Sequence, residues 1–553
     1  MKKLILLLVM CTSFGILMIN FDWGIPTDER LELLFEEQAE LNEITPNILA
    51  IKEKINRAKV NRYILKELLS KDEKLIQTVR EFLLVPYAGD DYFVMSAIKN
   101  LNPYKFQFDP KYYVYGGGLI YTGAVFLQAA SWMGFVHLIP EQTYYMRNPS
   151  EIGKLYLVLR FMIVLFAAMG VFIVYCITKN IYGEKIALLS WGIIMAIPVT
   201  YEASHTIEPH IFVLPFFALA FYYAYKSITS NIKDIRKNYI LSAIFAGFSI
   251  GTQASSLYIV FAFFSALIIN YKNNRFQRKM LLRYVLVYAL ISIGACLLVN
   301  PFYLLNYKGL ILDLQYGAGN VETQNPHFWI PSQLTWFLFL LFTTTIIYHT
   351  VSRKKDYFSM LSLSCIIPGI FIYITTKTHI PYVYPILPLL AILSVKMFTG
   401  ICFRIEGKWK YACVVLMVTC FLTFPVARSA YYLRNFTSEN RDLAGEWINN
   451  NVPKGSIIGV LYPPNNWDCM AFRFFNYKLV DYRKKDFGNV GNLPDVIVTV
   501  GRLLPERLSN KYSVVKGYAS KSIFGYRFEI DGELSSLIAR TIRIYSLKEE
   551  YRT

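Results

Sequence analysis

The sequence predicts an α-helical polytopic membrane protein that ends in a small α/β domain outside the cytoplasm. Composition is the first reason: of 553 residues, 54% are hydrophobic and only 17% are charged, which is little charge for a soluble protein of this length. Apolar runs close to bilayer-spanning length recur between residues 155 and 427. The polar tail after them alternates strand-like and helix-like segments. We therefore expect a transmembrane domain over 1–427 and a separate extracytoplasmic domain over 428–553.

Basic residues cluster in short loops between the apolar runs, and the net charge of the chain is +18. Such clustering is typical of cytoplasmic loops, so it predicts membrane lipids as surroundings and no nucleic-acid partner. The basic loops are 226–238, 270–283, 351–356 and 399–410. Together with Lys2 and Lys3, they predict a cytoplasmic N-terminus and a tail outside the plasma (inner) membrane.

The stretch 239–269 lies between two of these basic loops, so both of its ends are expected inside. It must then cross twice, and we expect two short helices that turn at Gly251-Thr252-Gln253. The basic loop 226–238 must also lie inside, so an even number of the five apolar runs before it must cross the membrane. One of these runs therefore does not cross. The run 118–138 is the better choice because it follows three glycines and contains polar residues, and 186–200 is the alternative. About 11 crossings then remain.

The first outer loop is expected to span 21–154. Before it, the run 4–20 lacks a small-x-small cleavage site, which favours a retained anchor over a cleaved signal. Residues 31–84 look helical and amphipathic, and Pro46 and Pro86 are expected to bracket the longest helical run. These juxtamembrane helices form either a solvated hairpin or a membrane-surface helix that shapes an acceptor path.

The tail contains short apolar runs that predict strands and one segment, 441–450, that predicts a helix. The predicted strands are 457–461, 496–500, 512–515 and 542–545. Strands that alternate with helix indicate a small α/β module. No nucleotide-binding fingerprint such as GxGxxG follows any of these strands.

An acidic pair, Asp28-Glu29, lies just past the first apolar run. Carboxylates are costly to place in hydrocarbon, so both are expected to face water or a polar cleft. Asp28 could also cap a helix that begins at Arg30. A second pair, Asp90-Asp91, could cap another helix or belong to the acidic site. All four fall in the predicted first outer loop, which puts the chemistry at the outer face.

Three basic residues are candidate phosphate contacts. Arg160 lies within an apolar run, where its side chain either reaches lipid headgroups or binds a phosphate. Lys377 and His379 lie in a predicted outer turn, which is either solvated or a second phosphate contact.

A cluster of acids and histidines lies between two apolar runs, and it comprises Glu202, His205, Glu208 and His210. It could form the polar wall of a cavity, pack at an interface or bind a metal. No recognised metal motif is present, so we expect no cofactor, with a divalent metal as the alternative. Several tyrosines upstream fit a membrane-interface belt, with sugar stacking as the alternative: Tyr112, Tyr113, Tyr115 and Tyr121.

Several motifs, in order along nearly the whole chain, resemble the GT-C superfamily of polyprenyl-phosphate-sugar-dependent glycosyltransferases, in its protein-mannosyltransferase-like branch (family 39). The motifs include GIPTDERLELLF, NLNPYKFQFDPKYYVYGGGLIY, the Glu208-Pro209 step, VNPFYLL, THIPYVYPILPLLAIL and RDLAGEWINNNVPKGSIIGV. The resemblance implies a sugar transfer from a polyprenyl-phosphate donor to an acceptor hydroxyl, with inversion. It also implies Asp28 as the general base and Glu29 as its neighbour.

This sequence departs from the family pattern in three places that concern the acceptor more than the fold. Phe108-Asp109-Pro110 replaces the usual His-Pro-Pro segment, Gln253 replaces a common Lys in the Gly-rich turn, and an insertion covers about residues 36–85. The acceptor could therefore be a protein, a lipid or a glycan, and the operative pair could be either acidic pair. A flippase for lipid-linked glycans and a non-enzymatic envelope scaffold are the competing functions, although the inverted repeat that is typical of transporters is not visible.

Overall fold

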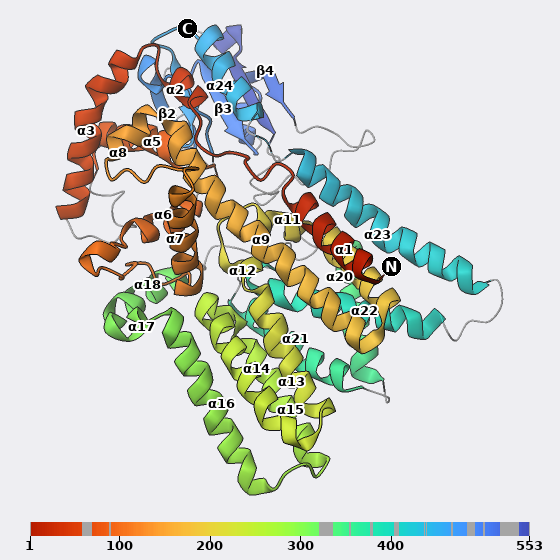
Figure 1. Cartoon of the computed structure of the whole chain (residues 1–553). Coiled ribbons are helices and arrows are strands. Elements are labelled where there is room, and N and C mark those ends of the chain that lie inside the picture. The colour runs from red at the N-terminus through yellow and green to blue at the C-terminus, as the bar shows by residue number, and fades with distance from the viewer. Residues whose placement is uncertain are drawn as a thin grey trace. The chain divides into compact units, whose positions relative to one another are not determined.

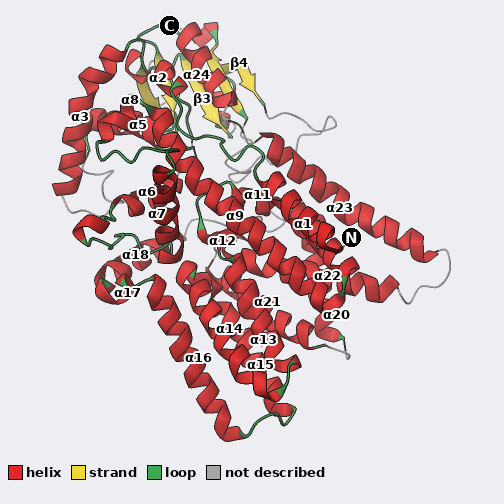
Figure 2. Ribbon diagram, in the orientation of Figure 1, coloured by secondary structure: helices red, strands yellow, loops and turns green. Residues whose placement is uncertain are grey.

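The structure is a computed structural model of the whole chain (Figure 1). It describes residues 2–57, 69–87, 90–319, 336–352, 356–376, 380–402, 409–435, 437, 439–465, 468–483, 493–501, 504–519 and 541–551. This part of the chain is mostly helical and includes one small sheet (Figure 2). The predicted class, a helical membrane protein with a small α/β element, agrees with this content.

Five helical segments among the described residues are long and apolar enough to cross a membrane. They are Pro149–Tyr182, Pro209–Thr229, Ala254–Lys272, Arg278–Val299 and Tyr382–Cys402. The helices α10 (Glu184–Ala196) and α11 (Pro198–Ser204) could add a sixth crossing as a broken span, because they meet at a bend of 67°. Three shorter apolar helices are α1 (Lys2–Leu17), α20 (Trp336–Val351) and α21 (Tyr357–Thr376). The count of about 11 crossings stays a prediction.

The chain divides into two compact units, which we describe separately. Unit 1 contains Met1–Phe21, Phe93–Phe126 and Leu159–Leu433, and unit 2 contains Asp22–Tyr92, Leu127–Val158 and Arg434–Thr553. The domain boundaries predicted from the sequence, 1–427 and 428–553 with the outer loop at 21–154, stay predictions.

Unit 1 is a helical bundle in which α14 (Ile232–Thr252) packs between α13 (Leu214–Thr229) and α16 (Arg278–Val299), side by side in Figure 1. Gly247 makes the contact with α16 possible, since a Cβ atom there would lie 2.3 Å from the Ser292 carbonyl oxygen. Small residues at such crossings allow helix backbones to approach closely.

The predicted turn at Gly251-Thr252-Gln253 is confirmed. Helix α14 ends at Thr252, Gln253 is extended, and the chain continues as a 3₁₀ turn (Ala254–Ile259) and α15 (Val260–Lys272). The Gln253 side chain holds this break, because its Nε2 donates to the Tyr382 carbonyl at 2.9 Å. This bond joins the break after α14 to a residue 129 positions further along the chain.

Unit 2 contains the predicted helical hairpin, α3 (Gln38–Arg57) and α5 (Lys71–Leu84), which pack on each other. The expected boundary at Pro46 is wrong, because α3 continues through this residue. Leu41, Ile48 and Ile51 are buried, and burial of this apolar face outweighs the hydrogen bond that proline removes. Thr45 supports the same turn by donating to the Leu41 carbonyl at 2.6 Å.

The tail contributes a five-stranded sheet in the order β2-β1-β3-β5-β4. Strand β1 (Ile457–Val460) pairs in parallel with β2 (Lys478–Asp481) and β3 (Val496–Val500), whereas β5 (Ile542–Leu547) pairs antiparallel with β3 and β4 (Tyr512–Tyr518). The predicted helix is also present as α24 (Glu439–Asn451). All four predicted strands are confirmed, and β2 was not predicted.

Candidate active site

Asp28 immediately precedes α2 (Glu29–Leu34), but its side chain makes no hydrogen bond to that helix. Instead, the Ser150 amide donates to Asp28 Oδ1 at 2.9 Å, and the Asp28 amide donates to Ser150 Oγ at 3.0 Å. Ser150 is the second residue of α9 (Pro149–Tyr182), where backbone amides lack partners within the helix. Asp28 therefore caps α9, which corrects the expectation that it would cap its own helix.

The acidic pair lies at the surface of the structure. Asp28 and Glu29 are both exposed, and within the described residues no hydrogen bond reaches Asp28 Oδ2. One carboxylate oxygen is thus oriented by Ser150 while the other can accept a proton. Such an arrangement suits a general base, which must be held in place and still reach its substrate.

Arg30 is a buried charged residue beside the acidic pair that the sequence did not single out. Its guanidinium is buried, with 2% of the residue exposed, and it donates to the carbonyls of Phe82, Val85 and Gly24 at 2.6–2.9 Å. The guanidinium also lies 4.2 Å from the ring centre of Tyr87. A buried cation with this many partners ties the chain before and after the acidic pair to α5. An arginine directly after two acids was the only signal.

The second acidic pair begins a helix, as one of its two interpretations expects. Asp91 is the first residue of α6 (Asp91–Lys99) and is fully buried, whereas Asp90 just precedes the helix and is half-buried. Burial makes Asp91 less accessible to an acceptor than the exposed Asp28. A role of this pair in the acidic site stays a prediction.

Unit 1 brings most of the predicted acid and histidine cluster together. His210 Nε2 lies 2.9 Å from Glu208 Oε2, and both side chains are largely buried. Glu202 in α11 is in electrostatic range of Glu208 and of Arg428. The His210 ring also packs against Tyr382, with ring centres 4.6 Å apart. We call Glu202, Glu208, His210, Tyr382 and Arg428 the polar wall, after the interpretation that predicted it. That these residues line a cavity stays a prediction.

His205 does not join this polar wall. Its Nε2 lies 2.7 Å from the Ile19 carbonyl and its Nδ1 lies 2.7 Å from the Tyr201 carbonyl, so both ring nitrogens are used by backbone. Among the described residues, no group of three or more His, Cys, Asp or Glu side chains could hold a metal ion. The expectation that the protein works without a cofactor stays a prediction.

The remaining candidates fall in different environments. Arg160 is fully buried within α9 and donates to the Phe21 carbonyl at 3.0 Å. Both of its predicted roles, the headgroup contact and the phosphate contact, stay predictions. Lys377 and His379 lie outside the described residues.

The predicted tyrosine belt is also wrong for three of its four members. Tyr112, Tyr113 and Tyr115 are buried. The Tyr113 hydroxyl donates to Asp109 at 2.6 Å and accepts from Asn306 at 2.7 Å. Polar groups that find partners inside a fold need not face the membrane interface, and the sequence could not show a partner so far along the chain.

Residues 144–298 match the family described as dolichyl-phosphate-mannose-protein mannosyltransferase. This segment is similar to the protein mannosyltransferases. Over these residues the match confirms the resemblance to the protein-mannosyltransferase-like branch. The mannosyltransferase-like segment contains Ser150, Arg160, Glu202 and Glu208, but it does not include Asp28.

Solved structures show only distant similarity. ArnT from Cupriavidus metallidurans bound to undecaprenyl phosphate is 12% identical, with 78% of this chain and 88% of that chain covered and a TM-score of 0.39. The Archaeoglobus fulgidus oligosaccharyltransferase in complex with Zn and sulfate is also 12% identical, with 74% and 62% covered and a TM-score of 0.39. Similarities this distant carry no argument about the site. The curated proteins contain no match to this chain.

Proposed function

We propose that this protein is an integral-membrane glycosyltransferase that moves a sugar from a polyprenyl-phosphate donor to an acceptor hydroxyl at the outer face of the plasma membrane. The match to the mannosyltransferase family supports a lipid-phosphate-linked hexose as donor and a protein as one possible acceptor class. A lipid or glycan acceptor uses the same hydroxyl chemistry. The five apolar segments support a multi-pass protein, with the N-terminus in the cytoplasm and the tail outside as proposed from loop charge.

The geometry of Asp28 is the observation that carries this proposal. In the proposed reaction, Asp28 Oδ2 takes the proton of the acceptor hydroxyl, and the hydroxyl oxygen forms a bond to the anomeric carbon. The bond from that carbon to the phosphate oxygen breaks at the same time, and the polyprenyl phosphate leaves with the electron pair. Attack opposite to the leaving group inverts the anomeric centre.

The other predicted residues have proposed roles around this step. Glu29 is the second carboxylate beside the base. Cationic groups stabilise the phosphate as it leaves, and the proposed ones are Arg160, Lys377 and His379. Asp90, Asp91, Glu202 and Glu208 are proposed substrate contacts, and no metal or other cofactor is proposed.

The test is transfer of sugar from a purified polyprenyl-phosphate donor by the reconstituted protein in buffer with EDTA. Asp28→Asn should lower kcat by roughly 10²–10⁴-fold, the usual range for a general base. The asparagine keeps a carbonyl oxygen for the Ser150 amide, so the cap on α9 survives. Glu32→Gln is the matched control, because Glu32 is another exposed carboxylate on α2 and should leave kcat unchanged.

Two results would contradict the proposal. Near-normal turnover of Asp28→Asn would move the base to Asp90, Asp91 or Glu208. Activity that disappears in EDTA and returns with a divalent cation would show that a metal takes part.

A further inference from the structure

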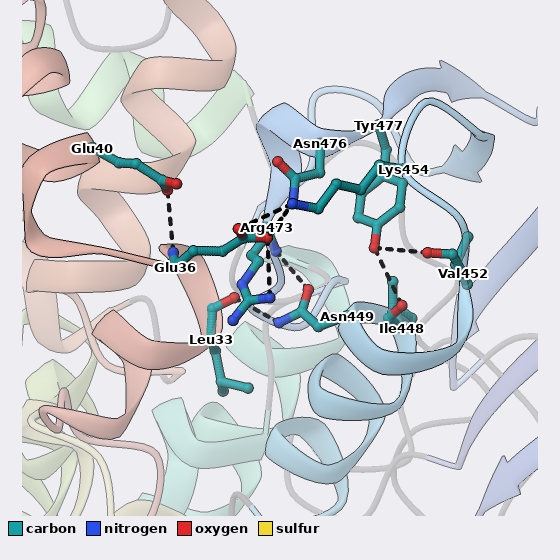
Figure 3. A network of polar contacts seen from close by, with 10 residues as sticks. All are labelled: Leu33, Glu36, Glu40, Ile448, Asn449, Val452, Lys454, Arg473, Asn476 and Tyr477. Atoms are coloured by element: carbon teal, nitrogen blue, oxygen red, sulfur yellow. Dashed lines mark hydrogen bonds and ion pairs between the residues drawn. The ribbon is translucent and has the colours of Figure 1, made fainter.

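The end of α2 is held by a group of polar side chains from the C-terminal part of unit 2 (Figure 3). Glu36 lies two residues past the helix. Lys454 Nζ lies 2.7 Å from Glu36 Oε1 and 3.0 Å from Oε2, and Arg473 Nη1 lies 3.3 Å from Oε1. Asn476 Nδ2 donates to the same oxygen at 3.1 Å. We call these four residues the Glu36 clasp.

A second contact fixes the last turn of α2 itself. Asn449 of α24 donates through Nδ2 to the Leu33 carbonyl at 2.9 Å, and its Oδ1 accepts from the Arg473 amide at 2.9 Å (Figure 3). Asn449 therefore links α2 to the same segment that supplies Arg473. The last carbonyls of a helix have no partner within it, so a donor from another element is needed there.

A third contact lies at the start of α2. Two guanidinium groups lie over the Tyr87 ring, with Arg30 at 4.2 Å and Arg441 of α24 at 4.5 Å from its centre. The Tyr87 hydroxyl donates to Asp442 at 3.3 Å. Contacts between a cation and an aromatic ring are stabilising when they are shielded from water, and Arg30 and Arg441 are both buried.

These contacts matter because α2 has only six residues. A helix this short has no stability of its own in water, so its direction is set by its neighbours. Each exposed ion pair alone contributes little. Several contacts that converge on both ends of one turn-and-a-half helix define the direction in which Asp28 and Glu29 point.

We propose that the C-terminal part of unit 2 positions the acidic pair, with Glu36, Lys454, Arg473 and Asn449 as positioning residues. This inference rests on the proposed function of Asp28. None of these four residues needs to touch the substrate, because they act through α2. A general base works only within hydrogen-bond reach of its proton, and small misplacements are costly.

Glu36→Gln in the reconstituted protein tests the proposal. The turnover number should fall about 10- to 100-fold while KM for the lipid donor stays within about 2-fold, because geometry at the base is lost and donor binding is not. The matched control is Asp481→Asn, which removes an ion pair to Arg483 at 3.1 Å in the same sheet region and should change neither value. A double variant, Glu36→Gln with Lys454→Met, should lose less than the sum of the losses in the two single variants, because the two side chains share one contact.

Hydrogen exchange provides a readout that does not depend on activity. Amides of residues 30–34 should exchange at least 5-fold faster in Glu36→Gln than in the unmodified protein or in Asp481→Asn. Unchanged exchange there, or an equal loss of kcat in the Asp481→Asn control, would overturn the positioning role.

The outcomes separate this inference from the proposed function. Loss of turnover in Asp28→Asn with normal turnover in Glu36→Gln would reject the positioning role alone. Full turnover in Asp28→Asn would reject the proposed base. The role of Glu36 in fixing α2 would then be decided by the hydrogen-exchange measurement alone. In the Asp28→Asn background, Glu36→Gln should cause no further loss of kcat, because there is no base left to position.

Discussion

At the scale of single residues, two neighbours in the motif DER have opposite environments. Asp28 is exposed and Arg30 is buried, although both carry full charges and are only two positions apart. The difference follows from partners: Arg30 meets three backbone carbonyls and an aromatic ring, whereas Asp28 meets one hydroxyl and one amide. The buried cation holds the loop that carries the exposed acid.

The first residue-scale prediction concerns Arg30. Arg30→Met keeps the aliphatic stem but leaves the carbonyls of Gly24, Phe82 and Val85 without this donor, which should lower the free energy of unfolding by about 2–4 kcal/mol. The change is measured by thermal unfolding in detergent, with proteolytic cleavage of the tail as the readout of unfolding. Arg147→Met is the control, because Arg147 is exposed and donates a hydrogen bond to the exposed Asn42 side chain at 3.2 Å. A similar loss in both variants would show that the buried contacts of Arg30 have no special weight.

At the scale of elements, helix α2 depends on other elements for its position, and one of its contacts depends on pH. The pKa of Glu36 is lowered below its ordinary value, chiefly because Lys454 donates a hydrogen bond to its carboxylate. About a third of this side chain is exposed, so solvent weakens the contact but does not remove it.

The sign of the pH effect follows from the lowered pKa of Glu36. A carboxylate whose pKa is lowered by folding stabilises the folded state fully at a pH above the pKa that it has in the unfolded chain, about 4.3. This stabilisation is lost as the pH falls through the lower pKa that the carboxylate has in the folded protein. At pH 7 the midpoint temperature of unfolding should therefore be higher for the unmodified protein than for Glu36→Gln. The two midpoint temperatures should converge below about pH 4.

Glu73 provides the internal comparison for that measurement. Its pKa is also lowered, mainly by the Lys54 hydrogen bond, but it is present in both proteins and cancels in the difference. A gap between the two midpoints that is constant from pH 7 to pH 3 would mean that Glu36 contributes through packing and not through its charge.

At the scale of the whole molecule, the chain combines apolar helices with a tail that forms a sheet. Loop charge predicts that the tail lies outside the cytoplasm. The proposed reaction agrees with that side, because the acidic pair belongs to the same compact unit as the tail.

Reporter fusions test this topology. A reporter that is active only in the cytoplasm should be silent when fused after Thr553 and active when inserted in the basic loop 226–238. The second fusion is the control for expression and insertion. Activity of the reporter after Thr553 would contradict the predicted number of crossings and would place the tail on the cytoplasmic side.

Local patterns account for what could be predicted from the sequence. The turn at Gly251-Thr252-Gln253, the helix at 441–450 and the four predicted strands of the tail are all present, because turn residues and alternating apolar residues act over a few positions. The exposed position of Asp28-Glu29 followed from the cost of placing charge in hydrocarbon. The boundary at Pro46 failed because burial of one face of α3 outweighed a local rule.

Partners far apart in the sequence account for the rest. The sequence by itself determined a helical membrane protein with a small α/β tail, a mannosyltransferase-like resemblance and an exposed acidic pair. Only the tertiary structure decided that Asp28 caps α9 through Ser150, 122 residues away, that Arg30 is buried, and that Glu36 meets Lys454, 418 residues away. Charge and periodicity act over a few residues or a whole loop, whereas a specific hydrogen bond between distant side chains depends on how the entire chain packs.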